Sequence, residues 1–147
     1  MTSSGPESSA KRPLLVLVVD DNVDAADSLA LLLVRLGGHQ ARVAYDARTA
    51  LCMAREFRPD VILLDIGLPQ KDGFSVAREL RAIPGLEDIV IIAVTGYGRE
   101  SDRDHSRAAG IDLHMLKPVD VRELLSYLRG DSAAQTADMR QSSDVNS

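Results

Sequence analysis

The sequence predicts an α/β fold in which helices cover both faces of a parallel sheet. Short apolar runs rich in Val and Ile recur along the chain without polar alternation, which is typical of strands buried on both faces. Helical patterns lie between these runs. Strands that alternate with helices form parallel sheets through right-handed crossovers. We count five strand–helix units, and ligands of such sheets bind beyond the carboxyl ends of the strands.

The first, third and fourth expected strands are strong apolar runs, and the second and fifth are weaker. In chain order we expect strands at Leu14–Val19, Gln40–Ala44, Val61–Leu64, Ile89–Val94 and Asp112–Leu116.

The expected helices show apolar residues at helical spacing, notably over 26–33, 50–57 and 121–128. Acidic residues that cap helix N-termini mark the starts of three helices, and glycines mark helix ends. The predicted caps are Asp46, Asp72 and Asp120, the last paired with Glu123, and the predicted ends are Gly37-Gly38 and Gly110. A fourth helix would carry a row of arginines on one face, Arg99, Arg103 and Arg107.

The chain has 147 residues and a formal charge of −5, which suits one acidic domain. We expect a folded body over 13–129 between disordered tails at 1–12 and 130–147, because both tails are small and polar. No output domain is then expected. One cysteine, no signal peptide and no long apolar run predict a cytoplasmic protein without a membrane span. The acidic balance argues against direct nucleic-acid binding.

Residues whose side chains can take part in a reaction or bind a metal ion follow the predicted strands. Asp20 and Asp21 end the first strand and Asp65 the third, while Thr95 ends the fourth and Lys117 the fifth. The fold would bring all of them to one edge of the sheet. Three carboxylates in one place repel each other unless a hard cation binds, and Mg²⁺ prefers a few carboxylates completed by water.

With Mg²⁺ and Lys117 the charges of the three carboxylates sum to zero, so the site could accept an anionic phosphoryl group. Asp65 would be the nucleophile and would form an acyl phosphate. Lys117 would neutralise one phosphoryl oxygen, and the Thr95 hydroxyl would donate to another.

The strings LVLVVDDN, VILLDIGLPQKDG, IIAVTGY and LKPVD resemble those of CheY-like response-regulator receiver domains, over essentially all of 13–129. The resemblance implies a flavodoxin-like (βα)5 fold with strand order 2-1-3-4-5. It implies phosphoryl transfer to Asp65 from a sensor-kinase or phosphotransferase histidine. It also implies metal contacts by Asp20, Asp21, Asp65 and the Gly67 carbonyl, and a cis peptide bond before Pro118. Such a domain is a signalling module rather than an enzyme.

The sequence differs from the family at His114, where a Tyr or Phe usually acts as a switch with the Thr95 position. Receivers fused to hybrid sensor kinases often carry His there. The family implies a phosphorylation-driven change in Thr95, His114 and Pro118 that alters partner binding. The resemblance does not identify the downstream partner, and it allows a dimer that forms on phosphorylation. Kinase docking is implied on the first helix, near Val23, Ala26, Asp27 and Ala30.

Two other functions are alternatives for these residues. A haloacid-dehalogenase-type phosphoryl-transfer hydrolase would need the motif D-x-D after the first strand. Here Asn22 stands in place of the second Asp of that motif. A pseudo-receiver that only binds partners would lack some of the residues that follow the strands, whereas all five are present here. Outside the site, we expect His39 at the surface, and we expect Cys52 to pack beside the apolar stripe of its helix.

Overall fold

The computed structural model describes residues 13–69, 71–96 and 108–130. Strands and helices alternate through these ranges as the sequence predicts. In chain order they are β1 (Leu15–Val19), α2 (Val23–Gly37), β2 (Gln40–Ala44), α3 (Ala47–Phe57), β3 (Val61–Asp65), α4 (Gly73–Arg81), β4 (Val90–Thr95), β5 (Leu113–Leu116) and α6 (Val121–Leu128). The two predicted tails and the predicted arginine-bearing helix lie outside the described residues, apart from Gly130.

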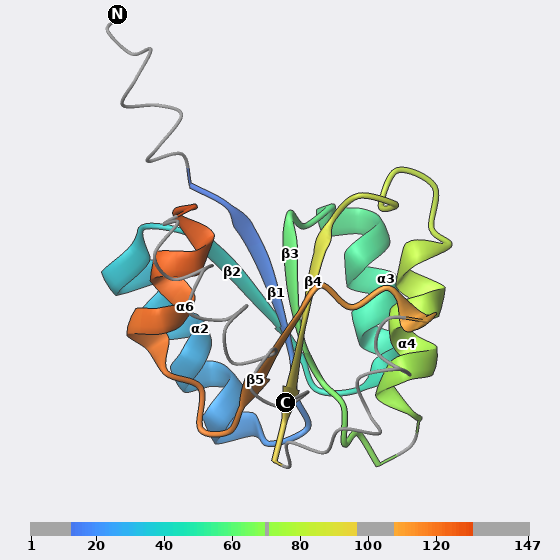
Figure 1. Cartoon of the computed structure of the whole chain (residues 1–147), viewed down its shortest axis with the longest axis horizontal. Coiled ribbons are helices and arrows are strands. Elements are labelled where there is room, and N and C mark those ends of the chain that lie inside the picture. The colour runs from blue at the N-terminus through green and yellow to red at the C-terminus, as the bar shows by residue number, and fades with distance from the viewer. Residues whose placement is uncertain (1–12, 70, 97–107, 131–147) are drawn as a thin grey trace, which may run out of the picture.

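All four strand pairings are parallel, and the order of the strands is β2-β1-β3-β4-β5. Helices α2 and α6 lie on one side of the sheet, and α3 and α4 lie on the other (Figure 1). The fold is therefore the predicted flavodoxin-like, doubly wound arrangement.

Two hydrophobic clusters, one on each face of the sheet, form the core. Alternate residues of a strand point to opposite faces, so β1 contributes Leu17 and Val19 to one cluster and Val16 and Val18 to the other. Burial on both faces explains the apolar runs without polar alternation. Among the described helices, none has the length and apolar character needed to cross a membrane.

Side-chain caps begin the helices at the predicted positions. Asp46, Asp72 and Asp120 each accept a backbone N–H from the first turn of α3, α4 and α6. Asn22 does the same for α2, from the amide of Ala25 at 3.1 Å. The first helix therefore starts immediately after the acidic end of β1.

Arg81, the last residue of α4, joins several segments at the amino-terminal edge of β4 and β5. Its guanidinium donates to the backbone carbonyls of Gly110, Glu87 and Ile89. It also contacts Oδ2 of Asp112 at 2.7 Å. This network holds the end of α4 against the starts of both strands.

Two predictions about side chains away from the expected site and docking face are wrong. His39 is buried, with 7% of its surface exposed, because Gly38 in a left-handed conformation turns the chain inward after α2. Cys52 is exposed rather than packed. It lies two residues after the buried Ala50, which on a helix places it on the opposite side.

Candidate functional site

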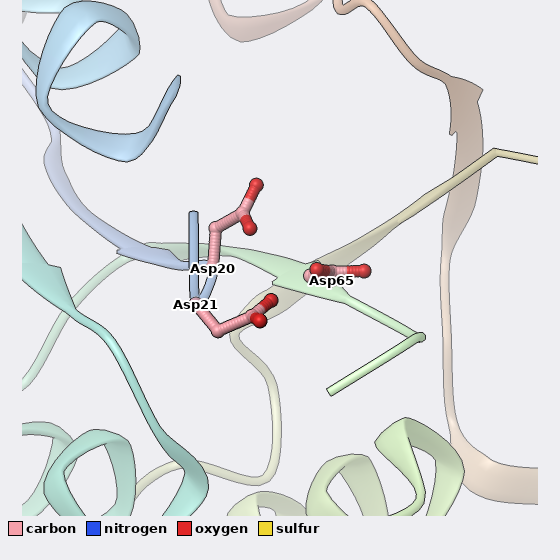
Figure 2. A group of neighbouring side chains, drawn as sticks. All are labelled: Asp20, Asp21 and Asp65. Atoms are coloured by element: carbon pink, nitrogen blue, oxygen red, sulfur yellow. The ribbon is translucent and has the colours of Figure 1, made fainter. Parts of the chain in front are cut away.

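The carboxyl ends of β1, β3, β4 and β5 meet at one edge of the sheet, because these strands are parallel and adjacent. Carboxylate oxygens of Asp20, Asp21 and Asp65 lie within 4.8 Å of one another. Figure 2 shows the three side chains gathered where β1 and β3 end. The predicted acidic cluster is therefore formed by residues that are far apart in the chain.

Asp20 and Asp65 are buried, with 8% and 5% of their surfaces exposed, whereas Asp21 is exposed. Each buried carboxylate has one oxygen held by a nearby amide. The amide of Gly67 donates to Oδ1 of Asp65 at 2.8 Å, and that of Asn22 donates to Oδ1 of Asp20 at 2.9 Å. These turns orient the two Oδ2 atoms toward the same neighbour.

That neighbour is Lys117, directly after β5. Its Nζ lies 3.1 Å from Oδ2 of Asp65 and 3.4 Å from Oδ2 of Asp20. Partial burial lowers the pKa of Lys117, but the hydrogen bond and charge of Asp65, with the charge of Asp20, outweigh it, so the pKa lies above its usual value. The ammonium is therefore held in its charged form.

The pKa of Asp20 is raised above its ordinary value. Burial is the largest cause, the hydrogen bond from Asn22 opposes it, and the negative charge of Asp65 adds to it. Lys117 thus compensates the repulsion between the buried carboxylates only in part.

The donor set suits a hard divalent cation. Three carboxylates within 4.8 Å of one another offer oxygen ligands, of the kind and small number that Mg²⁺ takes when water completes its shell. Gly67 lies two residues after Asp65 in the loop that leaves β3, beside the cluster. The three carboxylates are thus near enough to one another to share one ion.

Thr95 and His114 come to the same side of the sheet through the pairing of β4 with β5. Thr95 is the last residue of β4 and pairs with Leu116, and its carbonyl accepts the Lys117 amide at 2.9 Å. His114 is partly buried and pairs with Ala93. The Lys117–Pro118 peptide bond is cis, as the resemblance implies.

The first helix does not present all the residues expected to meet a kinase. Ala26 is 1% exposed and packs in the core, so it is not part of a docking face. Of the other expected residues, Val23 and Asp27 are exposed and Ala30 is half-buried. Leu31, Val34 and Tyr45 are further exposed side chains of this part of the surface.

Tyr45, at the end of β2, was not predicted to belong to this surface. Its hydroxyl donates to Oδ1 of Asp27 at 2.6 Å, and this hydrogen bond raises the pKa of Tyr45. Nothing in the local sequence links the two residues. The only available signal was that Tyr45 follows a strand at the carboxyl edge of the sheet.

A family model described as the response regulator receiver domain matches residues 16–129. The polar-differentiation response regulator DivK of Brucella anthropi is 32% identical over 117 residues, which cover 80% of this chain and 94% of DivK. The transcriptional regulatory protein PrrA of Mycobacterium tuberculosis is 39% identical over 114 residues, 78% of this chain. The chain spans 48% of PrrA, about half of that longer relative.

Solved structures agree in fold. Chemotaxis protein CheY4 of Vibrio cholerae superposes with a TM-score of 0.75 at 26% identity, covering 80% of this chain and 97% of CheY4. The receiver domain of the sensor histidine kinase PA1611 of Pseudomonas aeruginosa superposes with a TM-score of 0.70 at 31% identity, covering 80% and 98%. That structure holds a magnesium ion in its active-site cleft.

The predicted fold, the acidic edge of the sheet and the comparisons agree. The family is one of signalling domains in two-component systems rather than of classical enzymes. The chain belongs to the CheY-like response regulator receiver domain family.

Proposed function

We propose that this domain accepts a phosphoryl group on Asp65, from a phosphohistidine of a sensor kinase or a histidine phosphotransferase. The observation that supports it best is the contact of buried Asp65 with Lys117, beside Asp20 and Asp21, at one edge of the sheet. A buried carboxylate next to an ammonium and two further carboxylates suits attack of an anionic carboxylate on an anionic phosphoryl group, once an ammonium and a cation offset the charge.

In the transfer, a carboxylate oxygen of Asp65 forms a bond to phosphorus as the bond between phosphorus and the donor imidazole nitrogen breaks. The electron pair of the broken bond returns to the imidazole, and the product is an acyl phosphate. Magnesium, held by Asp20, Asp21, Asp65 and the Gly67 carbonyl, would neutralise charge on the phosphoryl oxygens when bound. Lys117 moves its ion pair from the Asp65 carboxylate to a phosphoryl oxygen, and the Thr95 hydroxyl donates to another.

The response to phosphorylation would pass through the β4–β5 pair. A hydrogen bond from the Thr95 hydroxyl to the phosphoryl group pulls on the end of β4, which is bonded through its carbonyl to the Lys117 amide. His114 lies in β5 three residues before Lys117, and Pro118 directly follows Lys117. We assign the switch to Thr95, His114 and Pro118, with altered partner binding or dimerisation as its result.

The phosphodonor would dock on the exposed face of α2, defined here as Val23, Asp27, Leu31 and Val34, with Tyr45 beside it. Val23 is 47% exposed and lies three residues from Asp20, so a protein seated on this face reaches the acidic edge. The acidic Asp24 and Asp27 at the near end favour a partner with basic residues around its histidine.

The test is labelling by a small phosphodonor, such as phosphoramidate, with Mg²⁺, followed by intact-protein mass spectrometry. We expect the wild-type protein to gain one phosphoryl group that is labile to base. The Asp65→Asn variant should gain none, and Asp24→Asn, which changes an exposed carboxylate of α2, should be labelled like wild type.

Equal labelling of Asp65→Asn would contradict the assignment of Asp65. Binding of Mg²⁺ with no labelling of wild type would instead favour a pseudo-receiver. Sustained turnover of simple phosphate esters would favour a hydrolase.

A further inference from the structure

His39 occupies a buried position at the edge of the sheet opposite to the acidic cluster. Its Nδ1 accepts the backbone N–H of Leu14 at 3.0 Å, just before β1 begins. Its own amide donates to the Leu33 carbonyl of α2 at 3.2 Å. One side chain therefore joins the start of β1 to the turn between α2 and β2.

The hydrogen bond defines the state of the ring. An imidazole nitrogen that accepts an N–H carries no proton, so His39 is neutral with its proton on Nε2. A second proton on Nδ1 would face the Leu14 N–H and remove the acceptor. The contact at 3.0 Å is therefore compatible with only one protonation state.

The surroundings of His39 do not compensate a positive charge. On α2, Gly37 packs so closely that a methyl group there would lie 2.7 Å from Cδ2 of His39 and 2.6 Å from Cδ2 of Leu125 on α6. Burial is the main cause that lowers the pKa of His39, and the positive charge of Arg129, at the end of α6, lowers it further.

The nearby carboxylate on the β3 side is already engaged. Oδ2 of Asp60 accepts the Leu15 amide at 2.8 Å, one residue beyond the contact of His39. From β2, the next residue is the uncharged Gln40, whose amide donates to the Leu14 carbonyl at 2.9 Å. The start of β1 is thus held by three partners, and His39 is the one whose residue type ordinarily titrates near neutral pH.

We propose that the His39–Leu14 contact is an acid-sensitive latch: protonation of the imidazole releases the start of β1 from the α2–β2 turn and loosens the ends of α2 and α6 packed there. The latch lies at the far edge from Asp65, so it regulates the stability of the domain rather than the phosphoryl chemistry.

The direction of the pH effect follows from linkage. A histidine in an unfolded chain has a pKa near 6.5, and His39 in the folded domain has a lower one. Between these two values the unfolded chain binds the extra proton and the folded domain does not. The contribution of His39 to the stability of the domain is therefore fully present above about pH 6.5 and is lost as the pH drops through this window. The unfolding equilibrium constant then rises by up to about tenfold per pH unit.

The experiment is urea unfolding of the whole chain from about pH 5 to about pH 8, a range that brackets the ordinary histidine pKa. The proteins compared are wild type, His39→Asn and His114→Asn. An asparagine oxygen can accept the Leu14 N–H but does not titrate. We expect the stability difference between wild type and His39→Asn to change with pH in the stated direction. The matched histidine variant, His114→Asn, should keep the dependence that His39 contributes.

Two further measurements use the wild-type protein alone, so the proposal can be tested even if His39→Asn does not fold. NMR should show His39 with an unprotonated Nδ1 at neutral pH and a pKa below the usual value. The protection factor of the Leu14 amide should fall as His39 titrates. The same pH dependence in His39→Asn, or a His39 that titrates at or above the usual value, would overturn the proposal.

Discussion

The ammonium of Lys117 lies 3.1 Å from Oδ2 of Asp65, although the two residues are 52 positions apart in the chain. The contact exists because β3 and β5 both end at the same edge of the sheet, on either side of β4. It gives the acidic cluster one positive charge, which competes with any cation that binds there and marks where a phosphoryl group would find its counter-charge.

Replacement of Lys117 by methionine should tighten Mg²⁺ binding. Without the ammonium, Asp20 and Asp65 lose a positive charge that repels an incoming cation, and we expect about tenfold stronger binding, ~1.4 kcal/mol. The apoprotein should also be less stable, so Mg²⁺ should raise its melting temperature more than that of wild type.

Isothermal titration with MgCl₂ measures the affinity directly. Lys71→Met is the matched control, since the ammonium of Lys71 pairs with Glu79 of α4 rather than with the cluster. Unchanged or weaker Mg²⁺ binding in Lys117→Met would show that Lys117 does not compete with the cation.

The α2 face can be tested separately from the chemistry. Val23→Lys places a positive charge beside Asp24, where we expect a basic partner, and should raise the KM for transfer from a phosphohistidine protein about tenfold. Labelling by phosphoramidate should not change, because Asp65 is untouched.

Leu36→Lys is the control for this prediction. Leu36 is 64% exposed at the other end of α2, away from the acidic edge, so the same change there should leave both donors unaffected. An equal effect of the two variants on protein-donor transfer would argue against docking at Val23.

Gly73 is required by the close packing of α4 against the loop after Asp65. A methyl group at Gly73 would lie 2.6 Å from Cα of Ile66, the residue that follows Asp65. We expect Gly73→Ala to lose about 1–3 kcal/mol of stability and to slow labelling of Asp65, because the loop must shift.

Gly67→Ala serves as its comparison. The added methyl group would meet Oδ1 of Asp65 at 3.5 Å, an ordinary contact, so the stability should stay within about 0.5 kcal/mol of wild type. Urea midpoints measure both variants, and an equally stable Gly73→Ala would show that the loop has room.

The site was predictable because its residues follow strands that the apolar runs reveal. Asp20, Asp65 and Lys117 each end or follow such a run, and parallel topology places those ends at one edge. Motif resemblance added the strand order and the expectation of a histidine phosphodonor. Thr95 and Lys117 proved to be joined through a backbone hydrogen bond, which a pattern of residue types does not contain.

Predictions about which way a side chain faces were less successful. Ala26 was expected on the docking face and His39 at the surface, yet both are buried. Ala26 is seven residues before buried Leu33, a spacing that places both on the inner side of α2. His39 depends on a turn at Gly38 and lies beside Gly37, which also packs against Leu125 of α6, a helix that begins more than eighty residues later in the chain.

By itself, the sequence determined the local elements: runs buried on both faces, capped helices, and acidic residues where strands end. These features depend on neighbours within a few positions, and periodicity records them. The tertiary structure decided which groups meet. The distance from Lys117 to Asp65, the Tyr45–Asp27 hydrogen bond and the burial of His39 each join separate elements, so they depend on how the helices pack on the twisted sheet.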